Sequence, residues 1–265
     1  MTANDHAIGP LRLGEHVADG SFLSILDKRG LTPTWDIGSA RTPQVPEATT
    51  VLALTWADGI LMAGDRRATA GNVIAHRRMR KVYAADDLSA VAISGTAGMA
   101  VELIRLFQTE LEHYEKIEGT HLSLEGKANY LARMVRGNLT LAFQGLVVIP
   151  LFCGYDATEQ VGKLFSFDVV GGRYDELNYA TTGSGGMEAK SFLKAAWKPN
   201  LTREEALTVA VEALVAAAEE DAATGGPDVK RGIYPTVISV TADGVTELDD
   251  ETLAVTTAQV LETRV

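Results

Sequence analysis

The sequence predicts an α+β fold in which two antiparallel sheets lie face to face, with a pair of helices on the outer surface of each sheet. Three observations support this four-layer αββα sandwich. Predicted elements run in the order strands, two helices, strands, two helices, strands. Tight turns such as Asp58-Gly59 and Asp243-Gly244 join neighbouring strands, which indicates antiparallel pairing. The predicted helices have apolar residues at helical spacing and need a sheet face to cover them.

The strands are predicted from short apolar and β-branched runs bounded by turn residues. They are expected at residues 50–55, 60–63, 81–83, 89–94, 147–155, 163–168, 179–182, 235–241 and 245–248. The helices follow from apolar residues that recur every three or four positions. They are expected at residues 95–118, 124–146, 187–197, 202–223 and 250–262.

Composition excludes several classes of protein. The net charge is −11, which argues against nucleic-acid binding through a basic surface. Cys153 is the single cysteine, so the chain has no internal disulfide and no cysteine-based metal site. Residues 1–20 lack the apolar core of a signal peptide, and no run approaches the roughly 20 apolar residues that cross a bilayer. We therefore expect a cytoplasmic protein without a membrane partner.

Residues 1–48 differ from the rest of the chain in composition and in predicted secondary structure. They contain four of the eight prolines and only one short predicted helix, from Ser21 as N-cap to about Gly30. The first apolar strand begins directly after this region, at the pair Thr49-Thr50. Residues 1–48 therefore form a separate segment ahead of a folded domain at residues 49–265.

Thr49, Asp65, Lys81 and Gly95 together predict an N-terminal nucleophile. A threonine hydroxyl needs a base, and a free α-amine with a reference pKa of about 7.7–8.0 can serve. Thr49 gains that amine only if the bond between Ala48 and Thr49 is cut, which would make residues 1–48 a propeptide. Lys81 would stay protonated and stabilise negative charge at the hydroxyl, while Asp65 would hold Lys81 in place. Gly95 opens a helix, so its N–H can stabilise an oxyanion.

Each of these features has a plainer interpretation when it is taken alone. A threonine pair is common at the start of a strand. Asp65 could pair with a neighbouring arginine on the surface, and Gly95 could simply start a helix. Their combination behind a propeptide-like segment makes the prediction specific.

From Thr49 onward the chain resembles the β subunit of the 20S proteasome in its bacterial, actinobacterial-type form. The matching stretches are residues 49–51, 63–69, 80–83, 95–98, 110–116, 134–139, 183–185 and 223–228. The resemblance implies the N-terminal nucleophile hydrolase fold. It also implies a threonine endopeptidase that removes its own propeptide and degrades unfolded or tagged proteins inside a closed chamber.

The resemblance also implies roles for individual residues. Thr49 matches the nucleophile and base, Asp65 and Lys81 match its charged partners, and Gly95 matches the oxyanion donor. The residues expected to hydrogen-bond around the threonine amine are Ser184 and Asp221, with Thr224 as a supporting hydroxyl. The positions whose backbone would hold the substrate as an added strand are Ala68, Thr69, Gly71 and Ala97. The pocket for the residue before the cut would be lined by Met79, Ile93 and Ala97. These three are apolar, so cleavage after apolar side chains is expected.

The implied partners are proteasome α subunits, other β subunits in a seven-membered ring, an ATPase ring and unfolded protein substrates. No metal or cofactor is expected. One departure from the family pattern concerns the cleavage site, where Ala48 stands in place of the usual glycine. Alanine restricts the tight turn that self-cleavage requires, so processing would be slowed or the precursor trapped.

Two alternative functions remain open at this point. One is a catalytically silent ring subunit, against which the intact Thr49, Asp65, Lys81 and Gly95 count. The other is an HslV-like peptidase, a family that shares the threonine start but usually lacks so long a propeptide and the stretch at residues 223–228.

Overall fold

The structure is a computed structural model that describes residues 49–264. The predicted propeptide, its helix between Ser21 and Gly30, and Ala48 lie outside the described residues. Among the described residues, none of the helices combines the length and the apolar character needed to cross a membrane.

The first sheet carries β1 in its interior and has the order β10-β1-β2-β11-β12, with every pair antiparallel. Its strands are β1 (Thr50–Trp56), β2 (Gly59–Gly64), β10 (Tyr179–Gly183), β11 (Thr236–Thr241) and β12 (Gly244–Glu247). Thr50 pairs with Gly183 of β10, and Val51 pairs with Gly64 of β2. The start of β1 therefore lies between the end of β2 and the end of β10.

The second sheet is also antiparallel and follows the chain in the order β5-β6-β7-β8-β9. Its strands are β5 (Val82–Asp86), β6 (Ser89–Gly95), β7 (Val148–Asp156), β8 (Val161–Phe167) and β9 (Arg173–Glu176). A separate hairpin of β3 (Ala68–Ala70) and β4 (Val73–His76) follows β2.

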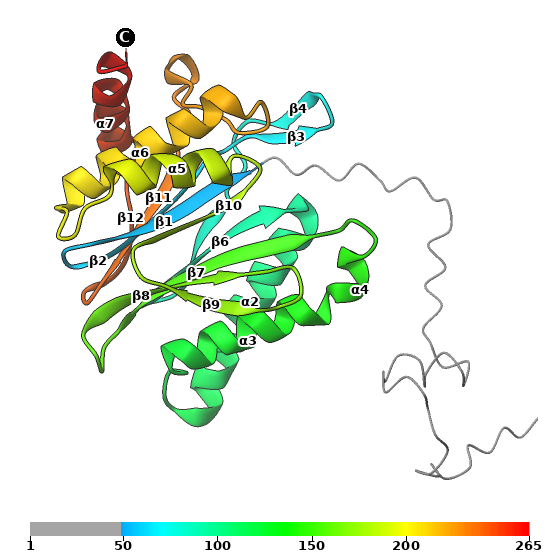
Figure 1. The fold of residues 1–265 in the computed structure, drawn as a ribbon. Helices are drawn as coiled ribbons and strands as arrows, with labels where there is room; N and C mark the ends of the chain where they lie inside the picture. Colours follow the sequence, from blue (N-terminus) through cyan, green and yellow to red (C-terminus); the bar gives the residue numbers. More distant parts are fainter. Residues whose placement is uncertain (1–48, 265) are drawn as a thin grey trace, which may run out of the picture. The chain divides into compact units, whose positions relative to one another are not determined.

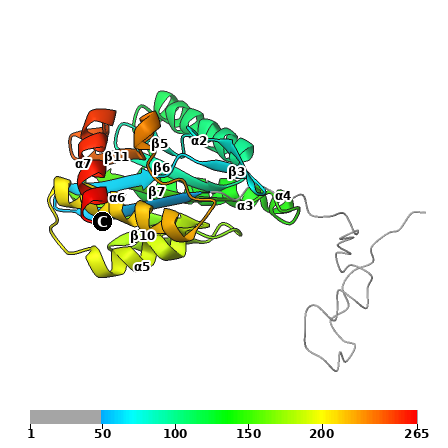
Figure 2. The same cartoon turned by 90° about the horizontal axis from the view of Figure 1, so that it is seen from above.

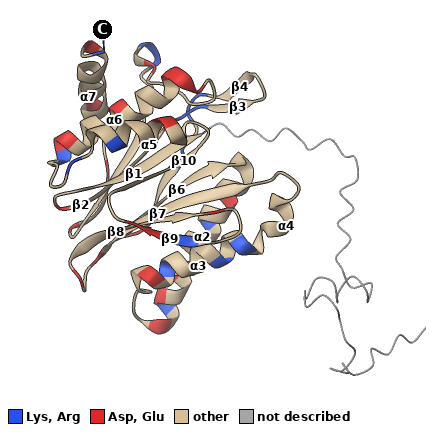
Figure 3. Ribbon diagram, viewed as in Figure 1, with Lys and Arg blue, Asp and Glu red and all other residues tan. Residues whose placement is uncertain are grey.

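Helices cover the outer face of each sheet (Figures 1 and 2). On the second sheet lie α2 (Ala97–Glu118) and α3 (Leu124–Gly137), and on the first lie α5 (Gly186–Ala196) and α6 (Arg203–Glu220). The last helix, α7 (Asp250–Glu262), packs against α6. The short helices α4 (Leu139–Ala142) and η1 (Val229–Arg231) lie in connections. Charged residues of both signs are interspersed along α2 and α3 (Figure 3).

The alternation of side chains along β1 builds two of the three core layers. Val51 and Ala53 pack between the two sheets, whereas Leu52 and Leu54 pack against the layer that contains α5 and α6. This period of two is what a strand buried on both faces requires. The predicted four-layer αββα sandwich is confirmed.

Some predicted boundaries were wrong. The helix expected over residues 124–146 ends at Gly137, and α4 begins only after Asn138. Glycine is a poor helix former, and it is followed here by an asparagine whose N–H bonds to the carbonyls of Val135 and Arg136. In the first hairpin the two turn residues are Ala57 and Asp58, because Gly59 already pairs with Trp56.

Candidate active site

Thr49 directly precedes β1 and is almost fully buried, with 4% of its surface exposed. Its position is fixed from both sides, because β2 and β10 flank the first residues of β1. The residues that follow these two neighbouring strands therefore surround Thr49. Asp65 follows β2, and Ser184 follows β10.

Asp65 is a buried carboxylate that accepts four hydrogen bonds. Its Oδ1 accepts from the Thr50 N–H at 2.8 Å and from the Lys81 ammonium at 2.6 Å. Its Oδ2 accepts from the N–H groups of Arg67 at 2.8 Å and Gly225 at 2.9 Å. A buried charge needs such a complete set of donors. Asp65 therefore pairs with Lys81 in the interior and not with an arginine side chain on the surface.

Lys81 lies immediately before β5, and its side chain is 1% exposed. Besides Asp65, its Nζ donates to the Arg67 carbonyl oxygen at 2.5 Å. Burial lowers the pKa of this ammonium, and although the Asp65 carboxylate opposes the effect, the pKa stays below its ordinary value of 10.5. Because Asp65 Oδ1 binds both Lys81 and the Thr50 N–H, the ammonium is held beside the peptide bond that joins Thr49 to Thr50.

A second polar group lies on the β10 side of Thr49. The Ser184 and Thr224 hydroxyls both donate to Asp221 Oδ2 at 2.6 Å, and the Thr224 Oγ1 lies 2.6 Å from the Thr50 Oγ1. The Thr49 nitrogen lies 3.4 Å from the Ser184 Oγ, a long contact. Burial raises the pKa of the Asp221 carboxyl, but hydrogen bonds from Ser184, Thr224 and its own loop outweigh burial and leave that pKa low.

Gly95 ends β6 and has a φ of +104°, which disfavours any residue with a side chain. A Cβ at this position would lie 2.1 Å from the Val147 carbonyl oxygen. The helix α2 begins two residues later, at Ala97, so Gly95 occupies the strand end and not the first helical turn. Gly95 and Thr49 line the same cavity.

That cavity has a volume of about 530 Å³. Its walls include Thr49, Gly95, Val147, Ile149, Met187 and Lys190. The cavity lining does not include Met79, Ile93 or Ala97, the residues predicted to form the pocket for the residue before the cut. Met79 and Ile93 are instead tied to the polar site through their N–H groups, which donate to the carbonyls of Arg66 and Lys81 at 3.0 Å. Ala68, Thr69 and Gly71 lie on the β3–β4 hairpin.

Comparison with known proteins identifies the family. The family model described as "Proteasome subunit" matches residues 45–229, which is more than half of the chain. The chain belongs to the proteasome subunit family. It is 53% identical over 235 residues to the protein named "Proteasome subunit beta" of Acidimicrobium ferrooxidans, covering 89% of this chain and 86% of that relative. It is 52% identical over 221 residues to the "Proteasome subunit beta" of Streptomyces griseus subsp. griseus, covering 83% and 79%.

Three residues of this proteasome-family site were not singled out from the sequence. Thr50 contributes both its N–H and its hydroxyl, and Gly225 contributes a backbone N–H from far along the chain. Gly183 has a φ of +102°, and a Cβ there would lie 1.9 Å from the Thr49 carbonyl oxygen. The glycines flanking Ser184 were the available signal, because such pairs mark close approach of two backbones.

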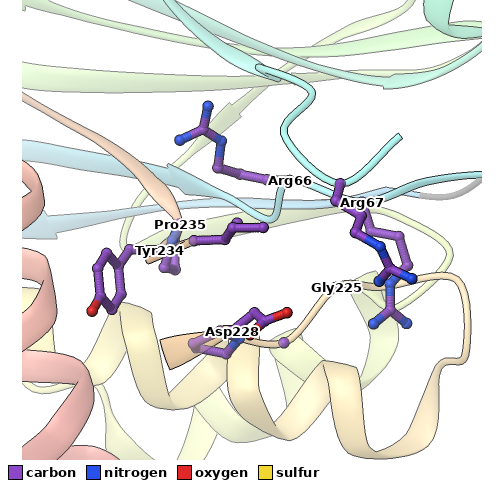
Figure 4. A pocket seen from close by; sticks show the side chains of 10 residues that line it. Arg66, Arg67, Gly225, Asp228, Tyr234 and Pro235 are labelled. Atoms are coloured by element: carbon purple, nitrogen blue, oxygen red, sulfur yellow. The ribbon is translucent and has the colours of Figure 1, made fainter. Parts of the chain in front are cut away.

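A smaller cavity lies between the residues that follow β2 and the segment from Gly225 to Pro235 (Figure 4). Its volume is about 30 Å³, which is room for a water and not for a peptide. The Arg67 guanidinium donates to the Ala222 carbonyl oxygen at 3.0 Å. This contact helps to hold the loop that delivers Gly225 to Asp65, so we assign this region a structural role.

Proposed function

We propose that this chain is a catalytic β subunit of the 20S proteasome core, a threonine endopeptidase whose nucleophile is Thr49. Its membership of the proteasome subunit family and the beta-subunit names of its relatives support the assignment. The observation that carries the catalytic proposal is Asp65, which holds the Lys81 ammonium and the backbone of Thr50 on one oxygen atom. A silent subunit would have no need to keep an ammonium buried beside Thr49.

The first covalent step in the proposal is removal of residues 1–48. The Thr49 hydroxyl oxygen bonds to the Ala48 carbonyl carbon, the bond from that carbon to the Thr49 nitrogen breaks, and the hydroxyl proton ends on that nitrogen. Water then hydrolyses the resulting ester, which releases Ala48 as a carboxylate and restores the hydroxyl. The product is a Thr49 that carries a free α-amine.

The peptidase cycle uses that amine as the base. The Thr49 oxygen attacks the scissile carbonyl carbon and its proton passes to the α-amine, while the Gly95 N–H stabilises the oxyanion. The C–N bond breaks, and the same proton moves to the leaving amine. Water, activated by the α-amine, then hydrolyses the acyl ester. Lys81 lowers the energy of the developing alkoxide, and Ser184, Asp221 and Thr224 orient the amine.

The proposal extends to substrate and assembly. The chain assembles with proteasome α subunits in the 20S core. Ala68, Thr69, Gly71 and Ala97 hold the peptide as an added strand, and Met79, Ile93 and Ala97 line the pocket for the residue before the cut. Rings of seven β subunits, an ATPase ring that supplies unfolded protein, and a cytoplasmic location complete the proposal.

Replacement of the nucleophile tests the catalytic assignment. We expect Thr49→Ala particles to lose peptide hydrolysis down to the uncatalysed background, because the variant lacks both the attacking hydroxyl and the means to cut the chain before residue 49 and free the α-amine. Thr49→Ser keeps a hydroxyl and should retain measurable activity. A threonine-directed covalent inhibitor should add its mass to the peptide that begins at Thr49. Equal hydrolysis by wild type and Thr49→Ala, or an adduct on another residue, would contradict the proposal.

A further inference from the structure

Two different surfaces meet at Thr49. Since β1 lies between β2 and β10, one side of Thr49 is reached from β2 and the other from β10. The β3–β4 hairpin continues from the β2 side through Asp65. The cavity of about 530 Å³ lies on the β10 side, because its lining includes residues of β10 and of α5 but none of the hairpin.

We infer that this cavity binds the part of the peptide that follows the scissile bond, and that Lys190 gives it a preference for an acidic residue there. The inference rests on the proposed function, in which the hairpin holds the residues before the cut. A peptide crosses the nucleophile in a single direction. If the residues before the cut lie along the hairpin on the β2 side, the residues after the cut must leave over the β10 side. The cavity on that side is lined by both Thr49 and Gly95.

The walls of the cavity suit a peptide segment. Val147 and Ile149 provide an apolar surface, and Met187 stands at the rim with 77% of its surface exposed. The volume lies within the range of about 300–1,000 Å³ that is typical of ligand sites. It therefore has room for more than one side chain.

Lys190 supplies the charge selectivity. Among the described residues that line the cavity, it is the only one with a charged side chain. Met187 and Lys190 are three residues apart on α5, so both side chains project from the same face of this helix. An ammonium at an open rim attracts a carboxylate weakly, and we expect selectivity of about threefold to fivefold for Glu over Gln.

The test uses assembled particles and internally quenched peptides that are identical up to the cut. The peptides carry Glu, Gln or Lys at the first or at the second position after the cut, and kcat and KM are measured separately. Wild type should prefer Glu, Lys190→Gln should lose that preference, and Lys190→Glu should prefer Lys. Lys194→Glu is the matched control, because Lys194 lies one turn further along α5, is exposed and does not line the cavity. It should retain the wild-type order.

An unchanged order of peptides in both Lys190 variants would overturn the inference. Equal loss of activity on all peptides would also overturn it, because that result would mean that Lys190 supports the fold and not the selectivity. Failure of the proposed function is a different result, in which Thr49→Ala hydrolyses the same peptides as fast as wild type.

Discussion

Two buried lysine–aspartate pairs have nearly the same geometry and different consequences. Lys81 and Asp65 lie 2.6 Å apart with side chains 1% and 0% exposed. Lys127 and Asp86 also lie 2.6 Å apart, with side chains 6% and 17% exposed. The difference between the pairs lies in what else each carboxylate binds.

Asp65 joins segments that are distant in the sequence, through the N–H groups of Thr50, Arg67 and Gly225. Within residues 49–264, the Asp86 carboxylate binds Lys127 and its own hairpin turn, where it accepts from the Leu88 N–H at 3.1 Å and from the Ser89 hydroxyl at 2.6 Å. The first pair therefore assembles a site, whereas the second attaches α3 to the β5–β6 turn. A buried ion pair acquires a chemical role through the groups gathered around it.

Replacement of Lys81 and of Lys127 by alanine should affect turnover very differently. Lys81→Ala should lower the turnover of assembled particles by roughly 10²–10³-fold, because a preorganised charge beside Thr49, the proposed nucleophile, is lost. Lys127→Ala should leave the turnover of folded particles within about twofold. It should lower the free energy of unfolding by about 3 kcal/mol, because Asp86 loses its buried partner. The turnover of both variants and the denaturant unfolding of Lys127→Ala are the measurements. A loss of turnover in folded Lys127→Ala particles equal to that in Lys81→Ala would contradict the different roles of the two pairs.

A second comparison sets a glycine of the site against one at a helix end. Gly183 and Gly119 both have positive φ, at +102° and +68°. A Cβ at Gly119 meets nothing within 4 Å, so Gly119→Ala should cost only the backbone strain, about 1–2 kcal/mol. Gly183→Ala forces the Thr49 carbonyl to move, so it should cost more stability and also lower kcat.

Thermal unfolding and kinetics of the assembled particles separate these two effects. If the Gly183 and Gly119 variants lost equal stability and neither lost activity, the close approach at Thr49 would have no importance.

The buried ammonium of Lys81 also predicts how activity and stability change with pH. Burial holds the pKa of Lys81 below 10.5, so the native protein loses this proton at a pH where the unfolded chain still keeps it. If activity needs the Lys81 ammonium, it should fall as the pH rises through the native pKa of Lys81, which lies below 10.5. Between the native pKa of Lys81 and the higher pKa of the unfolded chain, the unfolded state binds more protons than the native state. The free energy of unfolding contributed by Lys81 should therefore rise with pH over this range.

The alkaline limb of kcat/KM should persist in Lys127→Ala, because that variant leaves Lys81 and its surroundings intact. A shift of this alkaline limb in Lys127→Ala would contradict its assignment to Lys81.

The sequence predicted the elements that carry strong apolar patterns. The last helix was predicted at residues 250–262 and is found at Asp250–Glu262. The hairpin β3–β4 and the strand β9 were not predicted, because they are short and mostly exposed and therefore lack the alternation that marks a half-buried strand.

The candidate site was only partly predictable for a related reason. Thr49, Asp65 and Lys81 could be selected from the sequence because a hydroxyl, a carboxylate and an ammonium are side-chain groups with known chemical roles. Gly225 acts through a backbone N–H, which every residue except proline possesses, and it reaches Asp65 only through the fold. The cavity beside Thr49 is likewise lined by residues of β6, β7, β10 and α5, which only the fold brings together.

The proposal that Thr49 is an N-terminal nucleophile is tested by the N-terminus of the active particle, determined by intact mass and by sequencing of the terminal peptide. We expect peptidase activity to appear together with chains that begin at Thr49, and Thr49→Ala chains to stay uncut and inactive. Full activity from chains that keep residues 1–48, or from chains that begin at another residue, would contradict it.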